Sequence, residues 1–119
     1  MPNQTNATRG KFQAIKRIYI DAIGKLDKQE IAANQAGDTK TRDALIVARQ
    51  ALEQNLREVS RAEAKFLLSK ASLADLTQRL TGVRNDAQRA LKKMKQAEEA
   101  LKQATLLLKI LEGLVTLMT

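Results

Sequence analysis

The chain has no cysteine, no histidine and no tryptophan, and it contains a single proline and only three aromatic residues, Phe12, Tyr19 and Phe66. Without cysteine and histidine it cannot form a disulfide framework, a zinc site of the usual kind or a cysteine–histidine nucleophile pair. General acid–base catalysis by histidine is excluded for the same reason. The scarcity of aromatic side chains predicts a core of Leu, Ile, Val, Met and Ala.

Long apolar runs and a secretory leader are also missing. The first ten residues are polar, and no apolar run reaches the roughly 20 residues that a membrane-spanning helix needs. The most apolar segment, residues 106–118, is interrupted by Lys109, Glu112 and Gly113. We therefore expect a cytoplasmic protein, although secretion by a route without a signal is compatible with the same sequence.

The spacing of apolar residues predicts helices throughout. With 119 residues, 44% of them hydrophobic, we expect one helical domain over residues 1–119. From Phe12 to Ala33 the apolar residues recur in steps of three, four and seven, which is a helical spacing. We expect a first helix at about residues 7–36, with Gly37 in the left-handed position after it and Asp38 or Thr39 as the next N-cap.

After Thr39 the apolar and small residues follow a seven-residue repeat for eleven heptads in one frame. The first position of the heptad is mostly large and the fourth mostly small, a pattern that favours closely packed antiparallel helices. Asn55 occupies a fourth position, where it either sets the register of the helices or lies in a partly wet layer. The predicted core residues are Leu45, Leu52, Val59, Phe66, Leu80, Met94, Leu101 and Leu108.

The number of helices depends on one region. Weak helix formers gather between Ser69 and Asp86, and Gly82 followed by Asn85 is typical of a turn and a new N-cap. A turn there gives helices at about residues 39–81 and 84–118, whereas the continuous heptad phase favours one unbroken helix. In either case we expect an all-α fold, an elongated bundle or antiparallel coiled coil of two or three long helices.

No group of residues suggests catalysis or a cofactor. The five glycines are scattered, so there is no phosphate-binding loop, and a di-iron bundle would need Glu-x-x-His. Glu98 and Glu99 are adjacent on a predicted helix, so their side chains diverge instead of meeting at one substrate. We expect no enzymatic activity, no cofactor, no metal site and no small-molecule substrate.

Two surfaces are candidates for binding. The first is the C-terminal apolar face, which would need cover from the first helix, a second copy or lipid. The second is a basic patch in a chain of net charge +8, which attracts an acidic protein, anionic lipid or nucleic acid unless it serves only solubility. The apolar face comprises Leu106, Leu107, Leu111, Leu114, Val115 and Met118. The basic patch comprises Arg9, Lys11, Lys16, Arg17, Arg84, Arg89, Lys92, Lys93 and Lys95.

These features predict a non-enzymatic helical protein that acts as a protein–protein interaction or assembly module and self-associates. The alternative is a membrane-surface or membrane-active protein, because residues 11–23 form a basic amphipathic stretch and the last helix is rich in Leu. A nucleic-acid-binding role ranks third, since the aromatic side chains that stack on bases are almost absent.

Overall fold

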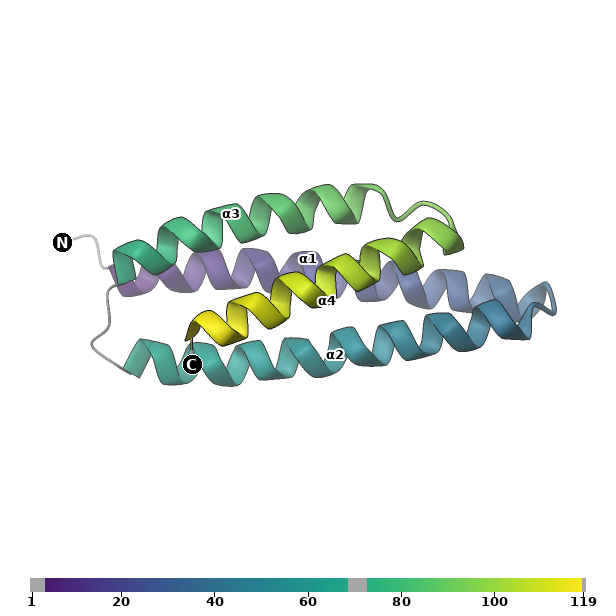
Figure 1. Cartoon of the computed structure of the whole chain (residues 1–119), viewed down its shortest axis with the longest axis horizontal. Helices are drawn as coiled ribbons and strands as arrows, with labels where there is room; N and C mark the ends of the chain where they lie inside the picture. The colour runs from purple at the N-terminus through teal and green to yellow at the C-terminus, as the bar shows by residue number, and fades with distance from the viewer. Residues whose placement is uncertain (1–3, 69–72, 119) are drawn as a thin grey trace.

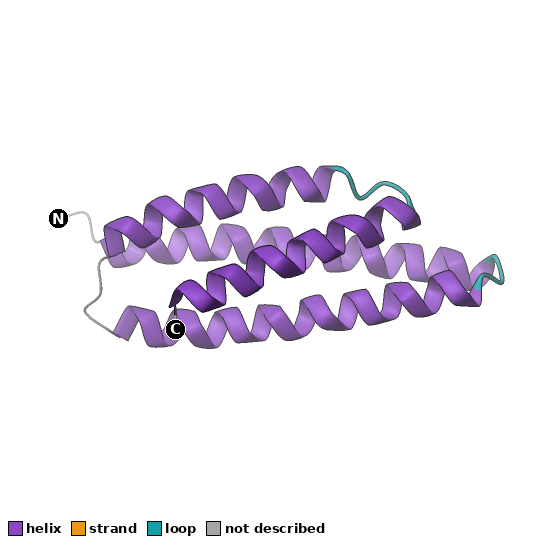
Figure 2. Cartoon of the chain, in the orientation of Figure 1, coloured by secondary structure: helices purple, strands orange, loops and turns teal. Residues whose placement is uncertain are grey.

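The structure, a computed structural model, describes residues 4–68 and 73–118, and these residues form a bundle of helices (Figures 1 and 2). The helices are α1 (Gln4–Gln35), α2 (Thr39–Leu68), α3 (Leu73–Lys92) and α4 (Ala97–Met118). The bundle measures 55 × 21 × 18 Å along its principal axes. The all-α prediction is confirmed, but the prediction of two or three long helices is wrong, because four helices are present in the described part of the chain.

The four helices are arranged in two parallel pairs. α1 packs against α2 and α3, and α4 packs against the same two helices, whereas the described residues of α2 and α3 make no contact. α1 and α3 run in one direction, and α2 and α4 both run in the opposite direction (Figure 1). α4 crosses the bundle diagonally, from the end of α3 toward α2, so it leaves α3 as it proceeds (Figure 1).

The turn between α1 and α2 follows the prediction. Gly37 has a φ of 74°, which a glycine adopts without a steric penalty. Its N–H donates to the carbonyl of Asn34 and that of Asp38 donates to the carbonyl of Ala33, which satisfies the last carbonyls of α1. Asp38 Oδ1 then accepts from the N–H of Thr41 at 3.1 Å and caps α2.

The predicted turn at Gly82 and Asn85 is wrong, because α3 continues through both residues. A glycine inside a helix costs only about 1 kcal/mol relative to alanine, which the packing of α3 against α1 and α4 can offset. The chain also leaves the helical conformation at residues 93–96, between α3 and α4, where Lys25 of α1 donates to the carbonyl of Leu91 at 3.0 Å and supports the end of α3. The predicted break-prone residues 69–72 lie outside the described residues.

The predicted core is correct in α2, in α3 and in the turn after α3, but shifted in α4. Leu45, Leu52, Val59, Leu80 and Met94 are buried, and the side chain of Phe66 lies outside the described residues. Leu101 and Leu108 are only half-buried. Because the turn at residues 93–96 interrupts the helix, the rotation of α4 is not tied to the heptad phase of α3. The buried face of α4 consists of Ala100, Ala104, Leu107, Leu111 and Leu114.

Polar contacts connect α1 to its neighbours. The hydroxyl of Tyr19, which is fully buried, donates to the backbone carbonyl of Leu107 in α4 at 2.9 Å. Lys16 forms an ion pair with Glu63 of α2, and Arg49 of α2 contacts Glu30 of α1 at 3.0 Å. These contacts fix the positions of α2 and α4 along α1.

We predict that Leu107→Ala lowers the free energy of unfolding by about 2–5 kcal/mol, because Leu107 is fully buried. Leu101→Ala, on the same helix and with the same change in helix propensity, should cost less than half as much, because Leu101 is half-buried. Urea denaturation followed by circular dichroism measures both values. Equal losses, or a larger loss at Leu101, would show that the uninterrupted heptad frame describes α4 after all.

We also predict that stability falls above about pH 10. Burial raises the pKa of the Tyr19 phenol well above its ordinary value of about 10. The unfolded chain therefore loses this proton at a lower pH than the folded chain, and stability present below pH 10 is lost as pH rises, by up to about 1.4 kcal/mol per unit.

Because Tyr19 is the single tyrosine of the chain, the absorbance of tyrosinate reports on this group alone. Denaturation curves recorded between about pH 9 and pH 11 should show the loss in the natural protein and a smaller one in Tyr19→Phe. Ionisation of Tyr19 in the folded protein near pH 10 would contradict the prediction.

Candidate functional site

The C-terminal apolar face lies mostly in the core of the same chain. Leu107, Leu111 and Leu114 are no more than 2% exposed, and Val115 is half-buried. Only Leu106 projects into solvent, with 46% of its surface exposed, and the side chain of Met118 lies outside the described residues. Because α4 folds back onto α2 and α1, these leucines are covered within the same chain, and they are not exposed as the candidate interaction surface would require.

The amphipathic stretch of α1 is also turned inward. Phe12, Ile15, Ile18 and Tyr19, whose apolar side chains would have to enter a lipid surface, are no more than 6% exposed. Ile20 is the exception in this stretch, at 58% exposed. Binding to a membrane through this face would therefore require the bundle to open.

Asn55 is half-buried on α2, and among the described residues its side-chain Nδ2 has no hydrogen-bond partner. A buried donor without a partner costs about 1–3 kcal/mol. In the part of the chain that the structure describes, no hydrogen bond of this amide supports a role of Asn55 in setting the register, and that role stays a prediction.

The predicted basic patch is divided among different faces of the bundle. Arg9 and Lys16 lie in a groove between α1 and α2, where Glu63 pairs with Lys16. Arg89 and Lys93 lie between α3 and α4. Lys11 is half-buried on α1, and Lys95 is exposed in the turn before α4. Arg17, Arg84 and Lys92 line one groove between α1 and α3.

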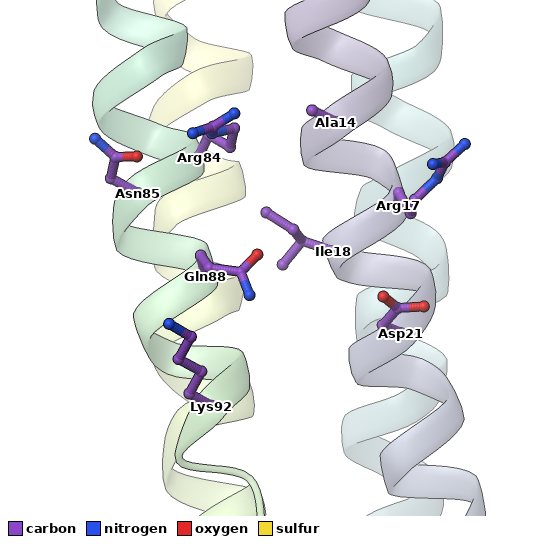
Figure 3. A pocket seen from close by; sticks show the side chains of 8 residues that line it. All are labelled: Ala14, Arg17, Ile18, Asp21, Arg84, Asn85, Gln88 and Lys92. Carbon is purple, nitrogen blue, oxygen red and sulfur yellow. The ribbon is translucent and has the colours of Figure 1, made fainter.

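The α1–α3 groove has a volume of about 460 Å³ and is lined mainly by polar and charged side chains, with Ala14 and Ile18 as its apolar residues (Figure 3). Ile18 and Gln88 extend toward each other from α1 and α3, and Arg84 lies on the side of α3 that faces α1 (Figure 3). Arg17 points away from α3, so it extends the positive charge along α1 instead of closing the groove (Figure 3). Asp21 is the one acidic residue in its lining.

A second groove, the α3–α4 groove, runs along the opposite side of α3. Two adjoining hollows of about 400 and 240 Å³ form it, and Asp86 and Ile110 line both. Its apolar lining comes from Val83 and Ala90 of α3 and from Leu106, Ile110 and Leu114 of α4. Basic side chains border it on both helices.

α3 therefore lies between two grooves and carries most of the charge that borders them. We call residues 79–93 the α3 basic surface; they comprise most of α3 and the residue after it. It has five basic residues against one acidic residue, Asp86, whose carboxylate pairs with Arg89 at 2.9 Å. Its basic residues are Arg79, Arg84, Arg89, Lys92 and Lys93. No ion pair among the described residues involves Arg84 or Lys92, so both are available to an anionic ligand.

Reasoning from the sequence missed Arg79, Lys109 and the two glycines of the α3–α4 groove. Arg79, Asp86, Arg89 and Lys93 recur at helical steps outside the heptad seam, and that spacing was the available signal. Gly82 and Gly113 are 31 residues apart in the sequence, so only the packing of α3 beside α4 shows that both line the same groove.

Neither a metal site nor a membrane span is found in the described ranges. Residues 4–68 and 73–118 contain no cluster of three or more carboxylate or other ligating side chains able to hold a metal ion. In the same part of the chain, no helix combines the length and the apolar character needed to cross a bilayer.

Comparison with known proteins adds little to this geometry. No protein-family model matches the chain, and no solved structure matches it. Over 99 residues, which is 83% of this chain, it is 30% identical to reticulocyte-binding protein 1 of Plasmodium vivax (strain Belem). The chain spans only about 3% of the length of that protein. A match to so small a share of a much longer protein does not assign the chain to its family.

We predict that deleting residues 105–119 abolishes cooperative folding, because the deletion removes three fully packed leucines, Leu107, Leu111 and Leu114. Each contributes about 1.5–3 kcal/mol by burial, and their sum is comparable to the whole stability of a small domain. Thermal unfolding and sedimentation of the truncated protein measure the effect. A truncated monomer that melts at the natural temperature would show that α4 is dispensable for the core.

Proposed function

We propose that the protein is a non-enzymatic interaction module whose α3 basic surface binds an acidic partner protein. The observation that carries the proposal is the position of α3 between two grooves with basic borders, of which the α3–α4 groove has the more extensive apolar lining. Apolar contact provides affinity, whereas the surrounding charge steers and selects an acidic partner. A surface that served only solubility would not need hollows beside its charges.

The other roles considered from the sequence receive less support. A membrane-surface role needs the apolar side chains of residues 11–23, most of which are buried between the helices. A nucleic-acid role needs either stacking aromatics or a groove-reading element, and Phe12 and Tyr19 are fully buried. Self-association stays a prediction and is not part of this proposal. The wide apolar stripes that motivated it are largely covered by the other helices of the same chain.

Labelled poly-L-glutamate serves as the test ligand for an acidic polypeptide, with binding measured by fluorescence polarisation. The double variant Arg84→Glu/Lys92→Glu should weaken binding roughly tenfold, since each reversed charge is worth a fraction of a kcal/mol to about 1 kcal/mol. The matched control is Arg57→Glu/Lys65→Glu, at two exposed α2 positions with the same spacing and the same change in net charge. The control should lose far less affinity.

Two outcomes would overturn the proposal. Equal losses in the two double variants would mean that net charge alone attracts poly-L-glutamate. Tighter binding to phosphatidylserine vesicles or to duplex DNA than to poly-L-glutamate, at the same ionic strength, would favour the membrane or nucleic-acid role instead. Ionic strength is held fixed because added salt screens all three interactions.

A further inference from the structure

The α3–α4 groove is open because the two helices that form it diverge. The α3–α4 interface is less extensive than the α1–α2, α1–α3 and α2–α4 interfaces, since α4 crosses from the end of α3 toward α2 (Figure 1). Gly82 of α3 and Gly113 of α4 both line the wider hollow, and a Cβ atom added at either position would meet no atom within 4 Å. The missing side chains therefore deepen the groove where the helices are already apart.

The groove also leaves apolar surface without cover. Leu106 is 46% exposed at one end, and Val83 and Ile110 are half-buried along the lining. From Arg79 to Lys93 the α3 wall extends about 21 Å, at 1.5 Å per residue, which matches a helix of about four turns. The lining is therefore a stripe of the length and character that one face of an amphipathic helix would cover.

The walls of the groove favour a helix over an extended strand. Both walls are α-helices whose backbone N–H and C=O groups bond within the helix, so they offer no sheet edge to which a strand could add. A docked helix satisfies its own backbone and needs only side-chain contacts. It would pack at the usual interaxial distance of about 8–10 Å.

Charge complementarity identifies the polar part of the occupant. Arg79 and Lys93 of α3 and Lys109 of α4 are exposed along the borders of the groove, and no ion pair in the described part of the chain involves them. Asp86, the one acidic residue of the lining, pairs with Arg89. An occupant that carries carboxylates beside its apolar stripe meets positive charge on both helices.

We infer that the α3–α4 groove is the docking site for an amphipathic α-helix of the partner, with acidic residues flanking its apolar face. The inference rests on the proposed function and specifies the element that the acidic partner presents. The docked helix becomes a fifth helix of the bundle. It covers Leu106 and Ile110 and places its carboxylates near Arg79, Lys93 and Lys109.

The test uses a labelled synthetic peptide of about four turns, with Leu at helical steps of three and four and Glu on both sides. The peptide should bind the natural protein and gain helicity on binding, as measured by fluorescence polarisation and circular dichroism. A twin peptide with Lys in place of Glu should bind at least about tenfold more weakly, a difference of about 1.4 kcal/mol.

Filling the groove tests its location. Gly113→Leu and Gly82→Leu should each weaken binding of the acidic peptide at least about tenfold. Gly24→Leu is the matched control, because Gly24 is also helical, exposed and without neighbours within 4 Å, but lies on α1 outside the groove. Leucine is a better helix former than glycine, so all three variants should keep their melting temperature or raise it.

A second pair of variants tests the charge without filling the groove. Lys109→Glu should weaken binding of the acidic peptide severalfold, whereas Lys102→Glu, exposed on α4 outside the groove, should have little effect. If a glycine variant proves unstable, this pair still tests whether the acidic peptide binds in the α3–α4 groove.

The inference is overturned if the acidic peptide does not bind, or if Gly24→Leu weakens binding as much as Gly113→Leu. It is also overturned if the natural protein self-associates and Gly113→Leu abolishes that association, because the occupant is then a second copy. The two proposals fail differently. Retained sensitivity of poly-L-glutamate binding to Arg84→Glu/Lys92→Glu, without any effect of the glycine variants, would remove the docking site and leave the proposed function standing.

Discussion

The burial of α4 against the other helices is the constraint on which the remaining structure depends. Leu107, Leu111 and Leu114 must leave water, and they do so between α1 and α2 instead of beneath a second molecule. To bring them there, α4 turns after residues 93–96 and crosses toward α2, where the hydroxyl of Tyr19 bonds to the carbonyl of Leu107. The same crossing separates α4 from α3 and opens the groove between them, so the core and the candidate docking site have one cause.

Local chemistry predicted local structure well. The turn at Gly37 and the cap at Asp38 were predictable because the residues that form them are adjacent in the sequence. The heptad frame identified the core of α2 and α3 because each is one helix with one phase. The predicted turn at Gly82 and the predicted number of helices were wrong for the same reason. Tertiary contacts, as well as weak helix formers, decide where a helix ends. Packing keeps α3 helical through Gly82, and Lys25, which caps the end of α3, is 66 residues away in the sequence.

The candidate site was less predictable than the core. Runs of basic residues at positions 9–17 and 84–95 suggested one patch, but a helix distributes successive residues around its circumference. Lys16 consequently faces Glu63 on α2, while Arg17 borders the α1–α3 groove and points away from α3. Which cations share a groove depends on the pairing of α1 with α3, and the heptad pattern does not specify which helices are neighbours. Recognition of the grooves required the three-dimensional arrangement.

The parallel pairing of the helices has an electrostatic consequence. Each helix carries a macrodipole equivalent to about half a positive charge at its N-terminus and half a negative charge at its C-terminus. Because α1 is parallel to α3, and α2 to α4, like helix termini lie side by side. Each end of the bundle therefore has a positive edge beside a negative one, and the polarity is reversed at the other end. The helix termini therefore form a quadrupole, so a charged group that reaches either end of the bundle meets attraction at one edge and repulsion at the other.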